Sequence, residues 1–560
     1  MIRPYLTAAA LVFAGGLATV PVQAESLAGS YLAATQATFD NDYKAAATYF
    51  TRTLALDPSN PALLQNALLS YIGTGDFGLA AATAQKMSGT PADSQLAQLV
   101  TIAELINRGE FASASDLFSE GAEFSPLLDG LLRAWIGIGQ GRMSDALAEF
   151  DTLSASSAMI VFSEYHRALA LAMAGDFEGA AKILDGAEGQ PLRIGRGSLE
   201  AHVKILSQLD RRDDAIAAID AAMNGSGDLE LLAYRDRLVA GETLPYNSVT
   251  SPAEGAAEVF LNLASILSGE DNDRFALIYG RLAQMLRPGD AETILLVAGI
   301  LSGQDQFDLA IEALDGVPAD SPAFYNAEIG RAQALQNAGR IEAAIEVLRS
   351  LAKANPTIPS VYTALGDALR RNSDFGAAAA AYDAAIKLLP EPQASQWFLY
   401  YARGISYERE GEWDKAEADF RFALELSPDQ PLVLNYLGYG MVEKRINLDE
   451  AQMMIEKAVE RRPNDGYITD SLGWVLYRVG KYEEAVAHME RAVELMPVDP
   501  IINDHLGDVY WKVGRTLEAE FQWRRALSFD PEPQEAERIR KKLEIGLDEV
   551  LKLEAAQKTE

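Results

Sequence analysis

The stretch at residues 506–531 decides the fold of this 560-residue chain, and it reads LGDVYWKVGRTLEAEFQWRRALSFDP. Small residues such as Gly507 and Ala519 allow two helices to approach closely, and large side chains such as Trp523 fill the space between them. Pro531 then prevents the second helix from continuing. The stretch therefore predicts two short antiparallel helices joined by a tight turn.

A helix-ending proline recurs at regular intervals through the C-terminal half of the chain. Prolines are spaced by 34, 34, 34, 38, 35, 34 and 34 residues, at positions 288, 322, 356, 390, 428, 463, 497 and 531. A period of 34 residues is that of the tetratricopeptide repeat, a helix pair that stacks on its neighbours. The sequence therefore predicts an all-α fold, a tetratricopeptide solenoid in which antiparallel helix pairs form a superhelix.

A central alanine in each repeat extends the array toward the N-terminus. It occurs at 46, 80, 114, 146, 180 and 215, and again at 276, 310, 344, 378, 416, 451, 485 and 519. The turn inside several pairs reads Gly-x-aromatic, as at Gly75, Gly175 and Gly480, where glycine accepts the left-handed conformation that ends a helix. We therefore expect about 14 repeats.

One interval departs from the repeat period, because Ala215 and Ala276 are 61 residues apart. The stretch between them is rich in turn residues. The interruption predicts an N-terminal arm at 26–240 with about six repeats and a C-terminal arm at 253–531 with about eight. Residues 241–252 are either a linker or a degenerate repeat within one continuous solenoid. Residues 532–560 are expected to form a C-terminal capping helix and a tail.

The first 24 residues have the pattern of an export signal. Arg3 precedes a short apolar segment, and Val22-Gln23-Ala24 offers small residues before a cut after Ala24. The alternative is an N-terminal anchor helix, which Gly15, Gly16 and Pro21 argue against. We therefore expect 1–24 to be a signal peptide and the mature protein to be soluble and periplasmic.

The composition excludes several classes of function. The chain has 48 Lys and Arg against 81 Asp and Glu, a formal charge of −33, which disfavours nucleic acid as a partner. It has no cysteine, which excludes disulfides, Cys-ligated zinc, iron–sulfur clusters and the acylated cysteine of a bacterial lipoprotein. No later stretch is long and apolar enough for a membrane helix, so we expect neither a lipid anchor nor a transmembrane segment after signal cleavage.

Motifs of catalysis and metal binding are lacking in the sequence. The four histidines, at 166, 202, 488 and 505, form no H-E-x-x-H pattern and no pair four residues apart. The glycine-rich run at 137–141 lacks the preceding strand that a phosphate loop needs, so it is interpreted as a turn between helices. We expect no catalytic residues, no cofactor and no metal, and the chain is not expected to be an enzyme.

Binding to a partner is the better prospect, because the first helices of stacked pairs build a concave surface. With repeats starting at 397, 431, 466 and 500, positions 2, 5, 9 and 12 of each repeat should face it. Aromatic and acidic residues alternate there, and this combination favours a ligand that carries Lys or Arg. The predicted groove residues are Phe398, Tyr401, Tyr439, Tyr467, Asp470, Trp474, Tyr477, Asp504, Asp508 and Trp511. The alternative is that these rings belong to the core between repeats.

The C-terminal repeats resemble a more specific family. The stretches NYLGYGMVEKRINLDEAQMMIEKAVERRPNDGYITDSLGWVLYRVG (435–480) and INDHLGDVYWKVGRTLEAEFQWRRAL (502–527) are similar to bacterial cell-envelope tetratricopeptide proteins. Some members of that family are outer-membrane lipoproteins that act as adaptors for a carboxy-terminal processing protease and present peptidoglycan hydrolases to it. This chain departs from them because it has no cysteine to acylate.

The resemblance implies protein binding. We expect an exported, non-catalytic scaffold that binds partner proteins or peptides on its concave surface, with an envelope protease and cell-wall hydrolases as its candidate partners. The alternative is a component of a polysaccharide or surface-appendage secretion complex, since aromatic platforms also suit sugars.

Overall fold

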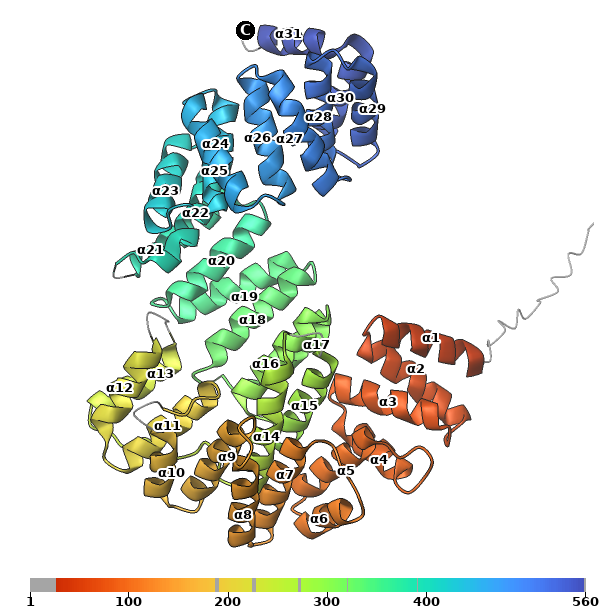
Figure 1. Cartoon of the computed structure of the whole chain (residues 1–560), viewed down its shortest axis with the longest axis vertical. Coiled ribbons are helices and arrows are strands. Elements are labelled where there is room, and N and C mark those ends of the chain that lie inside the picture. The colour runs from red at the N-terminus through yellow and green to blue at the C-terminus, as the bar shows by residue number, and fades with distance from the viewer. Residues whose placement is uncertain are drawn as a thin grey trace, which may run out of the picture. The chain divides into compact units, whose positions relative to one another are not determined.

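The computed structural model describes residues 27–186, 191–223, 228–269, 273–319, 321–389 and 391–557. These residues form α-helices joined by turns, with no strand among them (Figure 1). They divide into two compact units, unit 1 at Met1–Ala338 and unit 2 at Gly339–Glu560. The all-α repeat fold predicted from the sequence is confirmed.

Unit 1 consists of successive antiparallel helices. They are α1 (Leu27–Phe39), α2 (Tyr43–Leu56), α3 (Pro61–Thr74), α4 (Phe77–Met87), α5 (Gln95–Asn107), α6 (Phe111–Ser119), α7 (Pro126–Gly139), α8 (Met143–Ser154), α9 (Ile160–Met173), α10 (Phe177–Leu184), α11 (Arg196–Gln208), α12 (Arg212–Met223), α13 (Leu229–Val239), α14 (Pro252–Leu267), α15 (Asp273–Leu286), α16 (Ala291–Gly303), α17 (Phe307–Leu314) and α18 (Phe324–Asn337).

Unit 2 continues the same arrangement to the end of the described chain. Its helices are α19 (Ile341–Ala354), α20 (Pro359–Arg371), α21 (Phe375–Lys387), the short 3-10 turn η2 (Ala394–Gln396), α22 (Trp397–Arg409), α23 (Trp413–Leu426), α24 (Pro431–Lys444), α25 (Leu448–Arg461), α26 (Gly466–Arg478), α27 (Tyr482–Leu495), α28 (Pro500–Lys512), α29 (Thr516–Leu527), α30 (Pro533–Ile545) and α31 (Leu547–Gln557).

The turn within a pair follows from its Gly-Asp-Phe sequence. Gly75 ends α3 in the left-handed conformation, with φ of 80°, which a residue with a side chain seldom adopts. The Asp76 carboxylate then accepts a hydrogen bond of 3.1 Å from the Leu79 amide and so caps α4. Two adjacent residues therefore end one helix and start the next.

Close packing within each pair depends on the small residues that define the repeat. All 14 central alanines lie on second helices and are at most 1% exposed. In the last pair, a Cβ added at Gly507 would lie only 2.5 Å from the Trp523 ring. The glycine thus makes room for an indole that is itself fully buried.

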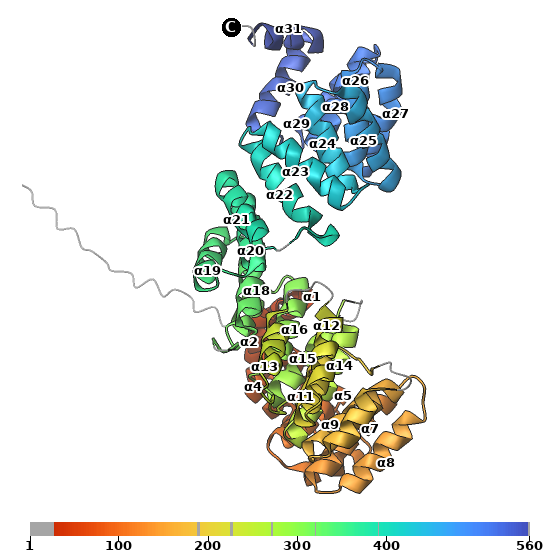
Figure 2. The ribbon, with the colours of Figure 1, turned by 90° about the vertical axis from the view of Figure 1, so that its left-hand side faces the viewer.

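The compact units divide at Ala338/Gly339, whereas the sequence placed the division between its two arms at 241–252. The reason is that α14 and α15, which follow the turn-rich stretch, pack back onto the first helices of the N-terminal pairs. Helix α14 contacts α5, α7 and α9, and α15 contacts α3 and α5 (Figures 1 and 2). The expected arm at 253–531 is therefore shared between both units.

The packing of α14 and α15 is close and mostly apolar. A Cβ at Gly255 on α14 would lie 2.3 Å from the Trp135 ring of α7, and both Trp135 and Phe260 are fully buried. The Arg281 guanidinium on α15 donates a hydrogen bond of 3.0 Å to the Gly73 carbonyl of α3. These helices therefore complete the core of unit 1.

The predicted signal peptide at 1–24 lies outside the described residues. Within the part of the chain that the structure describes, no helix combines the length and the apolar character that crossing a membrane requires.

Candidate functional site

The ten predicted groove residues all lie on four first helices of unit 2. Phe398 and Tyr401 are on α22 and Tyr439 is on α24. The others are Tyr467, Asp470, Trp474 and Tyr477 on α26, and Asp504, Asp508 and Trp511 on α28. We call the face that these residues share the inner surface of unit 2.

Their exposure differs along this surface. Phe398 and Tyr467 are exposed, at 42% and 56%. Tyr401, Tyr439 and Trp511 are half-buried. The five residues that are buried are Asp470, Trp474, Tyr477, Asp504 and Asp508. Exposed rings therefore occur on α22 and α26, and buried carboxylates occur on α26 and α28.

Trp474 is the centre of an aromatic stack. Its ring is 4.7 Å from that of Tyr477 and 3.9 Å from that of His505, nearly parallel to both. Its indole N–H donates a hydrogen bond of 2.7 Å to Glu443 on α24. The stack therefore ties three adjacent repeats together, and Trp474 contributes to packing whether or not a partner also touches it.

A buried charge pair lies beside the stack. His505 Nδ1 is 3.0 Å from an Asp470 carboxylate oxygen. Burial would by itself lower the pKa of His505, but the facing Asp470 carboxylate raises it above the usual value of 6.5. Asp470 is therefore already engaged within the protein.

Asp504 and Asp508 hold a lysine from the C-terminal helix. Lys542 on α30 is 1% exposed, and its ammonium lies 2.7 Å from Asp504 and 2.6 Å from Asp508. Asp508 also accepts a hydrogen bond of 3.0 Å from the Trp523 indole. Arg538 lies 3.6 Å from Asp504, one turn before Lys542 on α30. This end of the inner surface thus already contains a basic helix.

Trp511 lies against the junction of the last two helices. Its indole N–H donates a hydrogen bond of 3.0 Å to Asp548 on α31, and Lys512 forms an ion pair with the same carboxylate. A Cβ at Gly546 would lie 2.9 Å from the Trp511 ring. Trp511 therefore serves as the docking platform of α31.

Helix α24 offers a polar atom that the fold leaves unsatisfied. The side-chain oxygen of Asn435 is buried and has no hydrogen-bond partner among the described residues. Asn435 is one turn from Tyr439 on the same helix, and burial raises the pKa of the Tyr439 hydroxyl well above its usual value. Because this oxygen is shielded from solvent, it is not a contact point for a bound chain.

Sequence reasoning missed the partners of the acidic residues. The sequence predicted a capping helix within 532–560, but not that Lys542 and Arg538 would lie against Asp504 or that His505 would face Asp470. The available signal was the spacing of Asp504 and Asp508, four residues apart on one helix face, because two adjacent buried carboxylates require a nearby cation. The partner-binding role of the ten residues stays a prediction.

Comparison with known proteins identifies the repeat. The tetratricopeptide repeat model matches residues 329–391, 363–431, 447–500 and 471–532. Residues 329–431 and 447–532 carry tetratricopeptide repeats. The matches lie almost entirely in unit 2, which contains the four helices of the inner surface.

Two relatives share part of these repeats. A tetratricopeptide repeat-containing protein of Pseudomonas aeruginosa, PA4667, is 31% identical over 163 residues, which is 29% of this chain and 27% of PA4667. The general transcriptional corepressor ssn6 of Schizosaccharomyces pombe is 28% identical over 125 residues, 22% of this chain and 11% of ssn6. The chain thus spans less than a third of the length of either relative.

Among solved structures, the Cut9–Hcn1 hetero-tetramer of the APC/C is similar over 92% of this chain and 96% of the matched chain. Its sequence identity is 15% and its TM-score is 0.39. Yeast Tom70 matches over 93% of this chain and 95% of its own, with 16% identity and a TM-score of 0.30.

Proposed function

We propose that this chain is a non-catalytic scaffold that binds a segment of a partner protein on the inner surface of unit 2. The observation that carries the proposal is the exposure of two aromatic rings on first helices, Phe398 at 42% and Tyr467 at 56%. Lys542 already occupies Asp504 and Asp508, so the partner has to bind away from that end of the surface.

The part of the surface not in contact with Lys542 supplies further binding groups. Phe398 on α22 and Tyr467 on α26 are exposed and can make apolar contacts. Aromatic rings offer large contact area with few rotatable bonds. We therefore place the partner mainly over α22, α24 and α26.

Pull-down with purified variants of the full chain tests this placement. Phe398→Ala combined with Tyr467→Ala should reduce partner capture at least tenfold, while the helical circular dichroism spectrum stays unchanged because both side chains are exposed. The matched control is Leu517→Ala, which removes an 80% exposed side chain from α29, a second helix outside the inner surface. Equal capture by both variants would place the binding surface elsewhere.

We further propose that the protein is exported to the periplasm and there acts as an adaptor for an envelope protease and its cell-wall hydrolase substrates. The cleavable pattern at 1–24 and the resemblance of 435–480 and 502–527 to protease adaptors support this. N-terminal sequencing of the protein from its own cells should begin at Glu25. An N-terminus at Met1 in the cytoplasmic fraction would contradict export.

The alternative partner class is a polysaccharide or surface-appendage secretion complex, which the exposed rings of Phe398 and Tyr467 would also suit. Capture from an envelope extract separates the two. Recovery of a protease whose capture is lost in the Phe398→Ala, Tyr467→Ala variant supports the adaptor role, and recovery of secretion components without a protease contradicts it.

A further inference from the structure

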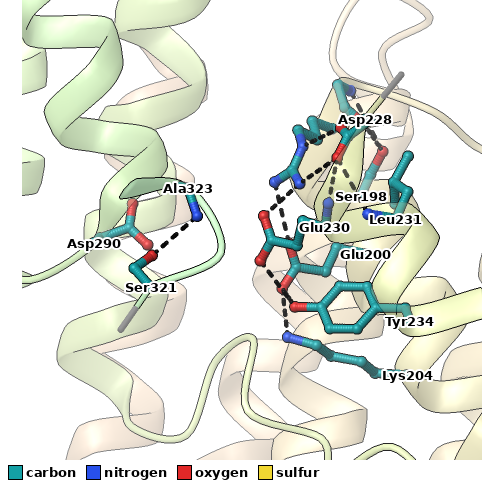
Figure 3. A network of polar contacts seen from close by, with 12 residues as sticks. Ser198, Glu200, Lys204, Asp228, Glu230, Leu231, Tyr234, Asp290, Ser321 and Ala323 are labelled. Carbon is teal, nitrogen blue, oxygen red and sulfur yellow. Dashed lines mark hydrogen bonds and ion pairs between the residues drawn. The ribbon is translucent and has the colours of Figure 1, made fainter. Parts of the chain in front are cut away.

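Unit 1 contains a cavity of about 610 Å³ that plays no part in the proposed function. It lies where α14 and α16 meet α9, α11 and the start of α13. Figure 3 shows polar residues from two of its sides, with Asp290 and Ser321 on one and Glu200 and Glu230 on the other. A cavity of this size can admit a small organic molecule or a long side chain.

The lining of the cavity is strongly acidic. Two arginines, Arg196 and Arg287, are its only basic lining residues among those described. Its carboxylates are Glu200, Asp228, Glu230, Glu254, Glu258, Asp290 and Glu292. Even with Lys204 paired to Glu200 from outside the lining, negative charge remains in excess.

One wall of the cavity is internally neutralised. The Arg196 guanidinium lies 3.1 Å from Asp228, 2.5 Å from Glu230 and 3.4 Å from Glu200. The Tyr234 hydroxyl completes the network, 3.1 Å from Glu200 and 3.0 Å from Glu230 (Figure 3). These carboxylates therefore have partners and form a rigid side of the cavity.

The opposite wall is only partly neutralised. Arg287 lies 3.4 Å from Asp290 but 4.0 Å from Glu258, too far for a hydrogen bond. Glu258 accepts a hydrogen bond of 2.9 Å from Tyr165 instead. Glu292 is half-buried in the lining and has neither a hydrogen-bond nor an ion-pair partner among the described residues.

Glu258 and Glu292 face the same point over α11. A Cβ built on Gly197 would lie 3.3 Å from Glu292 Oε2, 3.5 Å from Glu258 Oε1 and 3.6 Å from the Tyr165 hydroxyl. Because residue 197 is glycine, these three oxygens border the cavity beside its Cα without a side chain between them. The Ser248 hydroxyl in the lining is a further buried oxygen without a described partner.

These oxygens are not arranged for a metal ion, since no group of three His, Asp or Glu among the described residues could hold one. An alkylammonium or guanidinium ion, by contrast, carries several N–H donors that match separate oxygens. We propose that the cavity of unit 1 binds an organic cation, a primary amine or guanidinium, between Glu258 and Glu292 above Gly197.

The electrostatics of the cavity agree with this proposal. Burial, followed by the nearby Glu258 charge, raises the pKa of Glu292 to about 8, and burial also raises the pKa of Glu258. Both groups are therefore disfavoured as isolated anions, and a cation placed between them would relieve that repulsion.

The cation could come from a free polyamine or from a Lys side chain of a peptide. Calorimetric titration of the full chain would use spermidine as one probe and acetyl-Ala-Lys-Ala-amide as the other, with acetyl-Ala-Gln-Ala-amide as its neutral analogue. Binding of spermidine alone indicates a free polyamine. Binding of the Lys peptide but not of the Gln peptide indicates a peptide side chain.

Two variants assign the binding to the cavity. Glu292→Gln removes the charge and keeps the shape, and Gly197→Ala fills the space in a helix that accepts alanine. Each should lower the affinity for the probe that binds the wild type at least tenfold. The matched control Glu120→Gln removes one charge from an exposed position at the end of α6 and should change nothing.

Failure of both probes to bind, or equal affinity in all variants, would overturn the proposal. If Gly197→Ala loses helical content, Glu292→Gln decides alone. A loss of partner capture through unit 2 would leave this result unaffected, because the two sites share no residue.

Discussion

The two units differ in the helices that pack against their first helices. In unit 1, α14 and α15 cover the first helices of the N-terminal pairs with apolar contacts centred on Trp135 and Phe260. In unit 2, α30 meets the last first helix through a charge cluster in which Lys542 joins Asp504 and Asp508. Helices α14 and α15 are thus part of the core of unit 1, whereas α30 is a charged helix at the end of the inner surface of unit 2.

This difference indicates which of the two units keeps a surface open to a partner. Apolar burial contributes most of the stability of a domain, so α14 and α15 cannot leave without unfolding unit 1. A buried ion pair adds little net stability because desolvation offsets its attraction. The inner surface of unit 2 therefore keeps rings and polar atoms available, while that of unit 1 leaves only a cavity.

The largest effect is expected from crowding the apolar contacts of α14 in unit 1. Gly255→Ala places a Cβ 2.3 Å from the Trp135 ring, and both sides are rigid. We expect unit 1 to lose about 2–3 kcal/mol of unfolding free energy, measured by urea denaturation. Gly376→Ala is the matched control, since its Cβ would meet nothing closer than 3.7 Å, and it should leave stability unchanged or slightly raised.

The next effect tests the charged contacts of α30 in unit 2. Lys542→Met leaves Asp504 and Asp508 without their cation, and because α30 can detach locally, the loss of stability is confined to the end of unit 2. Limited trypsin digestion should then cleave α30 and α31 at least tenfold faster. Lys541→Met removes an exposed neighbour and one cleavage site as well, so its digestion should match the wild type. Equal rates in the two variants would contradict the ionic docking.

We expect the pKa of His166 in unit 1 and the pKa of His505 in unit 2 to be shifted in opposite directions. Burial lowers the pKa of His166 in unit 1 to about 3, and its Nδ1 accepts a hydrogen bond of 3.1 Å from Trp135. Its contribution to stability is therefore lost as the pH falls below 6.5. Asp470 outweighs burial and raises the pKa of His505, so its contribution is complete below pH 6.5 and is lost as the pH rises through that raised value.

Imidazole resonances in a heteronuclear spectrum measure this directly, since the chain has only four histidines. Between pH 5 and pH 8 the His166 signal should stay constant. The His505 midpoint should lie above 6.5. Coincident midpoints for the two residues would contradict the described environments.

The smallest effect concerns the cavity. Because the pKa of Glu292 is raised to about 8 from 4.5, the protonated form favours folding, and this stability is lost as the pH rises through 8. Glu292→Gln should therefore raise the melting temperature at pH 9 by about 2–4 °C and change it little at pH 5. A lower melting temperature at pH 9 would show that Glu292 has a stabilising partner.

The repeat fold could be predicted because its signals are local. The period of 34, the central alanines and the Gly-Asp-Phe turns each concern residues within one helix pair, and Ala519 and Gly507 pack as their spacing indicates. The place of the unit boundary depends on contacts such as Arg281 with Gly73, which are remote in sequence and leave no periodic signal.

The candidate site was predictable only in part for the same reason. Helical spacing placed Asp504, Asp508 and Trp511 on one face, but it could not show that α30 and α31 return to cover them. The cavity in unit 1 was not predicted at all, because Gly197, Glu258 and Glu292 come from three helices whose proximity only the closure of unit 1 creates.

Hydrogen–deuterium exchange of the full chain, resolved by helix, tests the contrast between these two modes of helix packing most directly. The account predicts that amides of α14 and α15 exchange only with global unfolding of unit 1, and that those of α30 and α31 exchange at least about tenfold faster through local opening. Equal protection of the two helix pairs, or faster exchange in α14 and α15, would contradict it.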